Sequence, residues 1–137
     1  MKETPTPDDA LVVLQLYDLR REAVMRDSRR TMLDWKPAGY DDLVAITRFE
    51  HPDNAAFRQV SSYFEMAFGM AHHGAVHAEL LAESTGEGLL MFAKIYPHLE
   101  RFREQFSPTA FQHAEWIATN TEFGRQRFAL FRERLER

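Results

Sequence analysis

The segment from Phe57 to His73 constrains the fold most, because it reads as a helix that is apolar on nearly every side. At helical spacing, most of its circumference is covered by Phe57, Val60, Tyr63, Phe64, Met66, Ala67, Phe68, Met70 and Ala71. One narrow polar line remains, at steps of three and four, and it consists of Arg58, Ser62, Glu65, Gly69 and His72. A helix of this kind belongs in the centre of a bundle. The segment therefore predicts an all-α protein built around one buried helix.

Glu65 is the one acid in this segment, and an unpaired carboxylate is costly to bury. We expect it to be buried and paired with a cation of the first helix, one of Arg20, Arg21, Arg29 and Arg30. A functional alternative also fits the pattern. Glu65, His72 and His73 would then form a ligand or proton-transfer cluster, and Gly69 would leave room for a small guest. In the structural alternative, Gly69 only lets a second helix approach closely.

The length and composition of the chain indicate one domain with a hydrophobic core. The chain has 137 residues, of which 45% are hydrophobic and 28% charged, and this combination excludes a disordered chain. No cysteine is present, which removes disulfides, thiolate metal sites and thiol catalysis and is compatible with the cytoplasm. The formal charge of -4 gives no general attraction to nucleic acid or anionic membranes. Apolar runs fall far short of the roughly 20 residues that cross a bilayer. We expect a soluble, cytoplasmic protein.

Helix start and stop signals divide the chain after a flexible lead-in at residues 1–7. The remainder, residues 8–137, is predicted to be a single-domain bundle of five to seven helices. The first helix should run from about Asp8 to Leu33, with an acid as its N-cap. Later helices should begin near Asp41, Asp53, Ala75, Glu87, Ser107 and Thr121. Gly74 should end the central helix, and Pro97 should kink or break the helix that contains it.

No metal or cofactor site is predicted. His73 and His77 are four residues apart, the spacing of helical metal ligands, but Gly74 interrupts the helix between them. The chain has no Glu-x-x-His motif, and its two His-Ala-Glu triplets lack the cysteines of a deaminase zinc site. Ser61 and Ser62 are not on a nucleophile elbow. Whether the protein is an enzyme stays open, and the catalytic candidates are Glu65, His72 and His73.

The last predicted helix is amphipathic and basic. Arginines at positions 125, 127, 132, 134 and 137 flank Phe128, Leu130 and Phe131, a pattern that can dock on a partner, an acidic membrane or a nucleic acid. Glu133 and Glu136 dilute this charge. We expect the helix to pack Phe128, Phe131 and Leu135 against its own bundle or a symmetry mate instead.

Three segments together resemble a family of uncharacterised bacterial all-helical proteins. They are Leu16–Glu22 (LYDLRRE), Phe57–Met66 (FRQVSSYFEM) and Phe92–Lys94 (FAK), and the likeness covers roughly the first 100 residues. The resemblance implies a bacterial origin and a helical fold, and it carries over no active residue.

The sequence therefore favours a non-enzymatic helical interaction module of unknown specific function. The high content of apolar and aromatic residues predicts self-association as a homodimer or binding of a protein partner. We expect no binding of nucleic acid or membranes. The alternative is a small-molecule-binding protein or an enzyme centred on Glu65 and on His72 or His73. A pocket that meets Glu65 would favour the alternative, whereas a filled core and an apolar patch would favour the interaction module.

Overall fold

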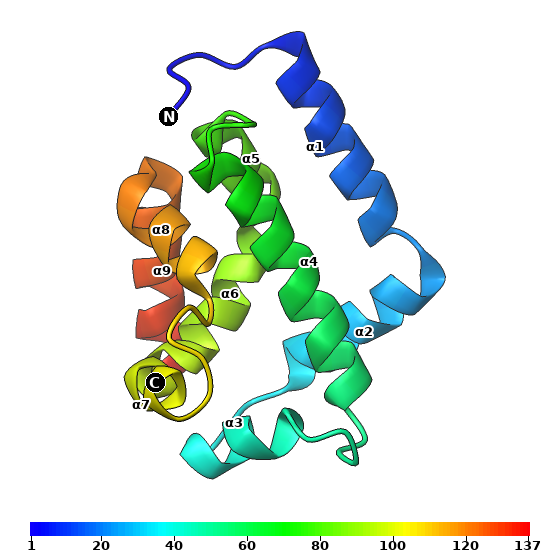
Figure 1. The fold of residues 1–137 in the computed structure, drawn as a ribbon, viewed down its shortest axis with the longest axis vertical. Coiled ribbons are helices and arrows are strands. Elements are labelled where there is room, and N and C mark those ends of the chain that lie inside the picture. The colour runs from blue at the N-terminus through cyan, green and yellow to red at the C-terminus, as the bar shows by residue number, and fades with distance from the viewer.

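The computed structural model describes residues 1–137 and consists of helices without any strand (Figure 1). The elements are α1 (Pro7–Arg20), α2 (Ala23–Asp34), α3 (Tyr40–Ile46), α4 (Asn54–His72), α5 (Ala78–Ser84), α6 (Gly86–Ile95), η1 (Tyr96–His98), α7 (Leu99–Gln105), α8 (Gln112–Asn120) and α9 (Glu122–Leu135). This confirms the all-α bundle. The nine α-helices outnumber the five to seven expected, because the predicted first helix breaks in two and the chain after Pro97 forms a separate helix. No helix combines the length and apolarity that crossing a membrane requires.

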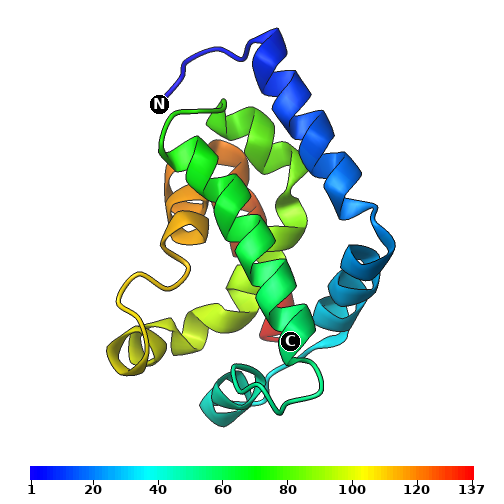
Figure 2. The ribbon, with the colours of Figure 1, turned by 45° about the vertical axis from the view of Figure 1, so that its right-hand side comes forward.

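The first helix does not run from Asp8 to Leu33 as expected; it breaks at Arg21 and Glu22. The Glu22 carboxylate accepts the backbone N–H groups of Val24 and Met25, at 3.0 and 2.9 Å. Because the first N–H groups of a helix have no partner within it, this side chain stabilises a new helix start, α2. The second half of the predicted helix therefore turns away from α1 and packs on α4 (Figure 2).

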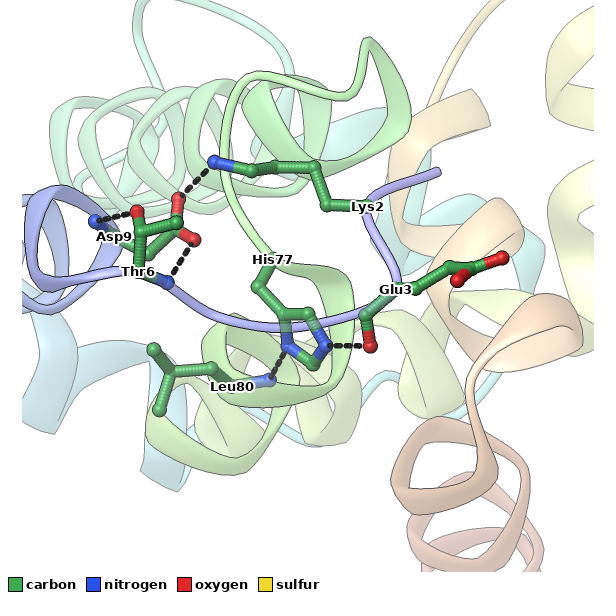
Figure 3. Close-up of polar contacts among 6 residues, drawn as sticks. All are labelled: Lys2, Glu3, Thr6, Asp9, His77 and Leu80. Atoms are coloured by element: carbon green, nitrogen blue, oxygen red, sulfur yellow. Dashed lines mark hydrogen bonds and ion pairs between the residues drawn. The ribbon is translucent and has the colours of Figure 1, made fainter.

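The N-cap of α1 is Thr6 and not the acid that the sequence suggested. The Thr6 hydroxyl accepts the N–H of Asp9 at 3.3 Å, and the Asp9 carboxylate accepts the N–H of Thr6 at 2.8 Å, which together form a capping box. Lys2 donates to the same carboxylate at 2.8 Å (Figure 3). This hydrogen bond from Lys2 is the main reason why the pKa of Asp9 falls to about 2.

The lead-in contacts the bundle at a second point, His77, which is the N-cap of α5 (Figure 3). The Nδ1 atom of His77 accepts the N–H of Leu80 at 3.1 Å, and its Nε2 atom lies 3.3 Å from the carbonyl oxygen of Glu3. His77 therefore ties the lead-in to α5. The flexibility expected for residues 1–7 stays a prediction.

The central helix α4 lies between the arm formed by α1 and α2 and the group formed by α6, α8 and α9 (Figures 1 and 2). It buries Phe57, Val60, Phe64, Ala67 and Phe68, as its apolar pattern predicts. Its end is also as predicted. Gly74 has a positive φ of 80°, and the N–H groups of residues 74 and 75 bond the carbonyls of residues 71 and 70. This is the Schellman motif, for which glycine is the favoured residue.

Two helix boundaries were predicted from prolines, one at Pro97 and one at Pro108. Pro97 breaks its helix as predicted, since α6 ends at Ile95 and a short 3₁₀ turn leads into α7. Ser107 and Pro108 do not open a helix as expected. The residues after them form turns, in which Ala110 bonds to the Ser107 carbonyl, and Phe111 adopts a left-handed conformation with a φ of 58°. Because a helix cannot pass through that conformation, α8 begins only at Gln112.

The last helix, α9, docks on its own bundle, one of the two arrangements expected. The Phe128 ring lies 5.4 Å from the Phe92 ring and 5.0 Å from the Tyr96 ring, measured between centroids. Phe131 also packs against the core, whereas Leu135 lies at the rim and is 37% exposed. The predicted apolar face of α9 is therefore a core contact over its first three turns.

Two glycines allow helices to approach closely. A Cβ atom added at Gly88 in α6 would lie 2.7 Å from the rings of Phe64 and Phe68. One added at Gly124 in α9 would lie 2.1 Å from the Ile117 carbonyl oxygen and 2.4 Å from the Thr121 hydroxyl. Real Cβ atoms do not approach other atoms this closely. Both positions therefore require glycine for reasons of space.

Candidate functional site

Glu65 joins α4 to the start of α8. Its two carboxylate oxygens accept the backbone N–H groups of His113 and Ala114, at 3.1 and 2.7 Å. These N–H groups belong to the first turn of α8, where the helix dipole is positive and no side chain of α8 itself caps the helix. Glu65 is thus an N-cap supplied by another helix, and its side chain is half-buried.

The expected pairing of Glu65 with an arginine of the first helix is wrong. Arg29 instead bonds both oxygens of Glu87 on α6, at 2.6 and 3.1 Å. Arg20 lies over the Tyr17 ring, and Arg21 and Arg30 are exposed. The arginines do not reach Glu65, because the break before α2 changes the direction of the second half of the predicted helix. The positive end of the α8 dipole interacts with the Glu65 carboxylate in their place.

The histidines of the same polar line meet a third histidine from α8. The Nδ1 atoms of His72 and His113 are 3.0 Å apart, so one of them carries the proton and the other accepts it. The His72 ring also stacks on the Trp116 indole, with 4.7 Å between centroids. His73 lies edge-on to His113 at 5.6 Å. Loss of solvent around the ring, followed by the nearby His113 and His73, lowers the pKa of His72.

The structure therefore brings Glu65, His72 and His73 to one helix contact and adds His113 and Trp116 to them. Sequence reasoning missed these two, because α8 is separated from α4 by about 40 residues and its face toward α4 has no periodic signal. In the sequence, His113 was noted only as part of a His-Ala-Glu triplet, which resembles half of a deaminase zinc motif. His77 is not part of the cluster, because it caps α5.

Little free space adjoins this cluster. A Cβ atom at Gly69 would meet the His113 ring at 3.0 Å, so the ring occupies the place where a guest could sit. The hollow that reaches Glu65 has a volume of about 10 Å³, room for one water molecule at most. No group of three or more His, Asp or Glu side chains is arranged to hold a metal ion. The geometry at Glu65 is that of a packed contact between helices.

Removing the carboxylate should weaken this contact by a moderate amount. Glu65→Ala leaves two N–H groups of α8 without their acceptor, and loss of an N-cap costs about 1–2 kcal/mol. Glu133→Ala is the control, since Glu133 only forms an exposed surface pair with Arg137 and its loss should cost less than about 0.5 kcal/mol. Urea denaturation of both variants measures the difference. Equal losses would show that Glu65 does not hold α8.

A larger cavity lies under α1, next to α4 and the end of α5. Its volume is about 410 Å³, within the usual range of ~300–1,000 Å³ for small-molecule sites. It is lined by Val13, Leu14, Leu16, Tyr17, Arg20, Tyr63, Ser84 and Thr85. Tyr63 donates its hydroxyl hydrogen to the Leu16 carbonyl, and burial raises the pKa of this phenol. The wall of the cavity is therefore mostly apolar, and Arg20 is its one charged residue.

The outer side of α1 is apolar and uncovered. Leu11 and Leu14 are 57% and 62% exposed, and they share an outermost line with Asp18 and Arg21 at steps of three and four. We call these four residues the α1 face. Both ribbon views show no other helix outside α1 (Figures 1 and 2). Two leucines on the solvent side set α1 apart from an ordinary surface helix, whose outer face is polar.

Comparison with known proteins identifies a family and no activity. A family model described as a domain of unknown function (DUF4760) matches residues 5–121. The chain belongs to this family. The match confirms the resemblance to an uncharacterised family and extends beyond the first 100 residues to the end of α8. No curated protein matches the chain. No solved structure matches it either. The function of this DUF4760 domain is unknown.

Proposed function

We propose that this chain is a non-enzymatic helical interaction module that forms a homodimer through the α1 face. The observation that carries the proposal is the bare outer side of α1, where Leu11 and Leu14 are more than half exposed. The first helix contacts the rest of the bundle mainly through α5 and α2. Exposed leucines at helical spacing are the residues through which helices pair. Covering them would remove apolar surface from water.

Charge favours an antiparallel pair of α1 helices. Asp8 lies in the first turn of α1, and Arg21 is its C-cap. A parallel pair would place acid beside acid, base beside base, and the two helix dipoles side by side in one direction. An antiparallel pair instead opposes the two helix dipoles and brings the acidic first turn of one copy to the end of the other that carries Arg20 and Arg21 together with Asp18. With Leu11 of one copy opposite Leu14 of its partner, the surface is self-complementary, as two-fold symmetry requires.

The alternative function, ligand binding or catalysis at Glu65, His72 and His73, has one supporting observation. The partial burial of His72 lowers its pKa, which favours the neutral imidazole that a proton acceptor requires. Against it, both Glu65 oxygens are engaged and the adjoining hollow is about 10 Å³. We therefore favour the interaction module. We extend the proposal to the bacterial cytoplasm, which the family resemblance and the cysteine-free composition support, and to partners other than nucleic acid or membrane.

Leu11→Glu should dissociate the dimer. Two-fold symmetry places the new carboxylate in the interface twice, and each buried leucine contributes about 1.5–3 kcal/mol, so the dimer Kd should rise at least about 100-fold. Analytical ultracentrifugation over a concentration series measures it. Phe49→Glu is the control, because Phe49 is 80% exposed in the loop after α3, away from α1. A monomeric wild type at high concentration, or equal effects of both variants, would contradict the proposal.

Cross-linking tests the antiparallel register directly, since the chain has no cysteine of its own. A mixture of the Leu11→Cys and Leu14→Cys proteins should form more disulfide-linked dimer on mild oxidation than either protein alone. Strong linking of Leu11→Cys to itself would indicate a parallel pair. Phe49→Cys provides the background level of random collisions. Linking no stronger than this background in every combination would remove the α1 face as the interface.

A further inference from the structure

The cavity under α1 contains one feature that the proposed dimer does not use, the guanidinium of Arg20. The Nε atom of Arg20 is buried and has no hydrogen-bond partner, and no side-chain nitrogen of Arg20 donates a hydrogen bond to the protein. A buried donor without a partner costs about 1–3 kcal/mol, and more when it is charged. Arg20 as a whole is half-buried and forms no ion pair with any acid of the chain.

The neighbouring groups cannot supply that partner. Glu87 is engaged by Arg29 through both of its oxygens, and the Arg29–Glu87 pair is itself mostly buried. The Arg20 guanidinium lies over the Tyr17 ring, 5.0 Å from its centre. This stacking holds one face of the planar group. The Nε atom is closed to solvent, so the two Nη nitrogens are the ones left to donate to a ligand.

Three hydroxyl groups around the cavity already have partners. The hydroxyls of Ser84 and Thr85 donate to the carbonyls of Leu80 and Leu81, at 3.0 and 2.6 Å. Tyr63 donates to the Leu16 carbonyl. The cavity thus offers a ligand one free cationic donor and an apolar wall, which comes mainly from the α1 residues Val13, Leu14, Leu16 and Tyr17.

We propose that this cavity binds a small organic anion, a carboxylate carried on an apolar chain or ring. The carboxylate would accept N–H groups of Arg20 in a charge-assisted hydrogen bond, and the apolar body would fill the space against α1. A compact, fully charged ion such as free phosphate fits less well, because a single arginine and an apolar wall cannot replace its hydration. The site lies within one chain, and Leu14 is the one lining residue that it shares with the α1 face.

Three eight-carbon probes distinguish the contribution of the anionic group to binding from that of the apolar chain. Octanoate should bind, with isothermal titration calorimetry as the measurement, and octanol and octylamine should bind at least about tenfold more weakly because they lack the anionic group. Vesicles of phosphatidylglycerol should not bind, since a headgroup held at a membrane surface cannot bring an apolar chain into the cavity. Octanol binding as tightly as octanoate, or vesicle binding that exceeds octanoate binding, would overturn the proposal.

Arg20→Gln should weaken octanoate binding at least about tenfold and leave the weaker octanol binding unchanged. Arg30→Gln is the control, because Arg30 is an exposed arginine of α2 that lines neither the cavity nor the α1 face. A second variant, Val13→Phe, should reduce binding of both probes by filling the cavity. Circular dichroism first shows that each variant is folded. Octanoate binding that is absent in the wild type, or equal in wild type and Arg20→Gln, would refute the site whether or not the protein is a dimer.

Discussion

Truncation after Glu122 is expected to abolish the fold. This truncation removes all but the first residue of α9, the helix that packs on α6 and α8 and places Phe128 against Phe92 and Tyr96. Burying a phenylalanine contributes about 1.5–3 kcal/mol, and Phe128 and Phe131 both pack on the core. The bond from the Arg132 guanidinium to the Ala93 carbonyl, at 3.1 Å, would be lost as well. These losses approach the roughly 5–15 kcal/mol by which a domain is stable.

The matched control is truncation after Glu133, which removes only exposed residues beyond the core contact. This shorter deletion should leave the midpoint of thermal unfolding nearly unchanged in circular dichroism, whereas truncation after Glu122 should give no cooperative transition. The family match ends at residue 121, so the longer deletion also asks whether the matched region folds without α9. Full stability after that deletion, with salt-sensitive binding of the intact chain to DNA or anionic vesicles, would make α9 a basic tail instead.

Gly124→Ala is expected to destabilise the protein by at least about 3 kcal/mol. In an exposed helix the same substitution usually stabilises by about 1 kcal/mol, because alanine has the higher helix propensity. Here the sign reverses, since the new Cβ atom would lie 2.1 Å from the Ile117 carbonyl oxygen. That oxygen belongs to the backbone of α8, so α8 and α9 would have to separate, and overpacking of this kind is costly.

Gly39→Ala provides the control for that substitution. Gly39 has an extended φ of -164°, and a Cβ atom added there meets nothing within 4 Å. Its effect on the free energy of unfolding should stay within about 1 kcal/mol. Chemical denaturation of both variants, with the wild type alongside, makes the comparison. A Gly124→Ala protein as stable as the wild type would mean that α8 and α9 do not approach as closely as described.

Features that depend on local signals could be predicted from the sequence. The apolar circumference of α4 predicted its place in the core, and Gly74 predicted its end. Pro97 predicted the break between α6 and α7. Each of these effects acts within one or two helical turns. Glu65 was correctly singled out as an acid that needs a partner. Its actual partner could not be predicted, because backbone N–H groups leave no mark in the amino-acid sequence.

Features that depend on contacts between distant segments could not be predicted. Gly88 carries no signal in its own segment, yet it lies against two phenylalanine rings of α4. The break before α2 had no glycine or proline to mark it, and the start of α8 depends on the left-handed Phe111 and on Glu65. The same holds for the cavity under α1, because its lining comes from three segments of the chain.

The cap that Glu65 supplies to α8 has a consequence for how the chain folds. A helix as short as α8 is unstable alone in water, and this one has no capping side chain of its own. Its formation must therefore wait until α4 is in place, across a loop whose closure costs entropy. Folding should proceed from α4 outward, with α8 among the late elements. In the native protein, amide hydrogens of α8 should exchange whenever its contact with α4 opens, so the two helices behave as one cooperative unit.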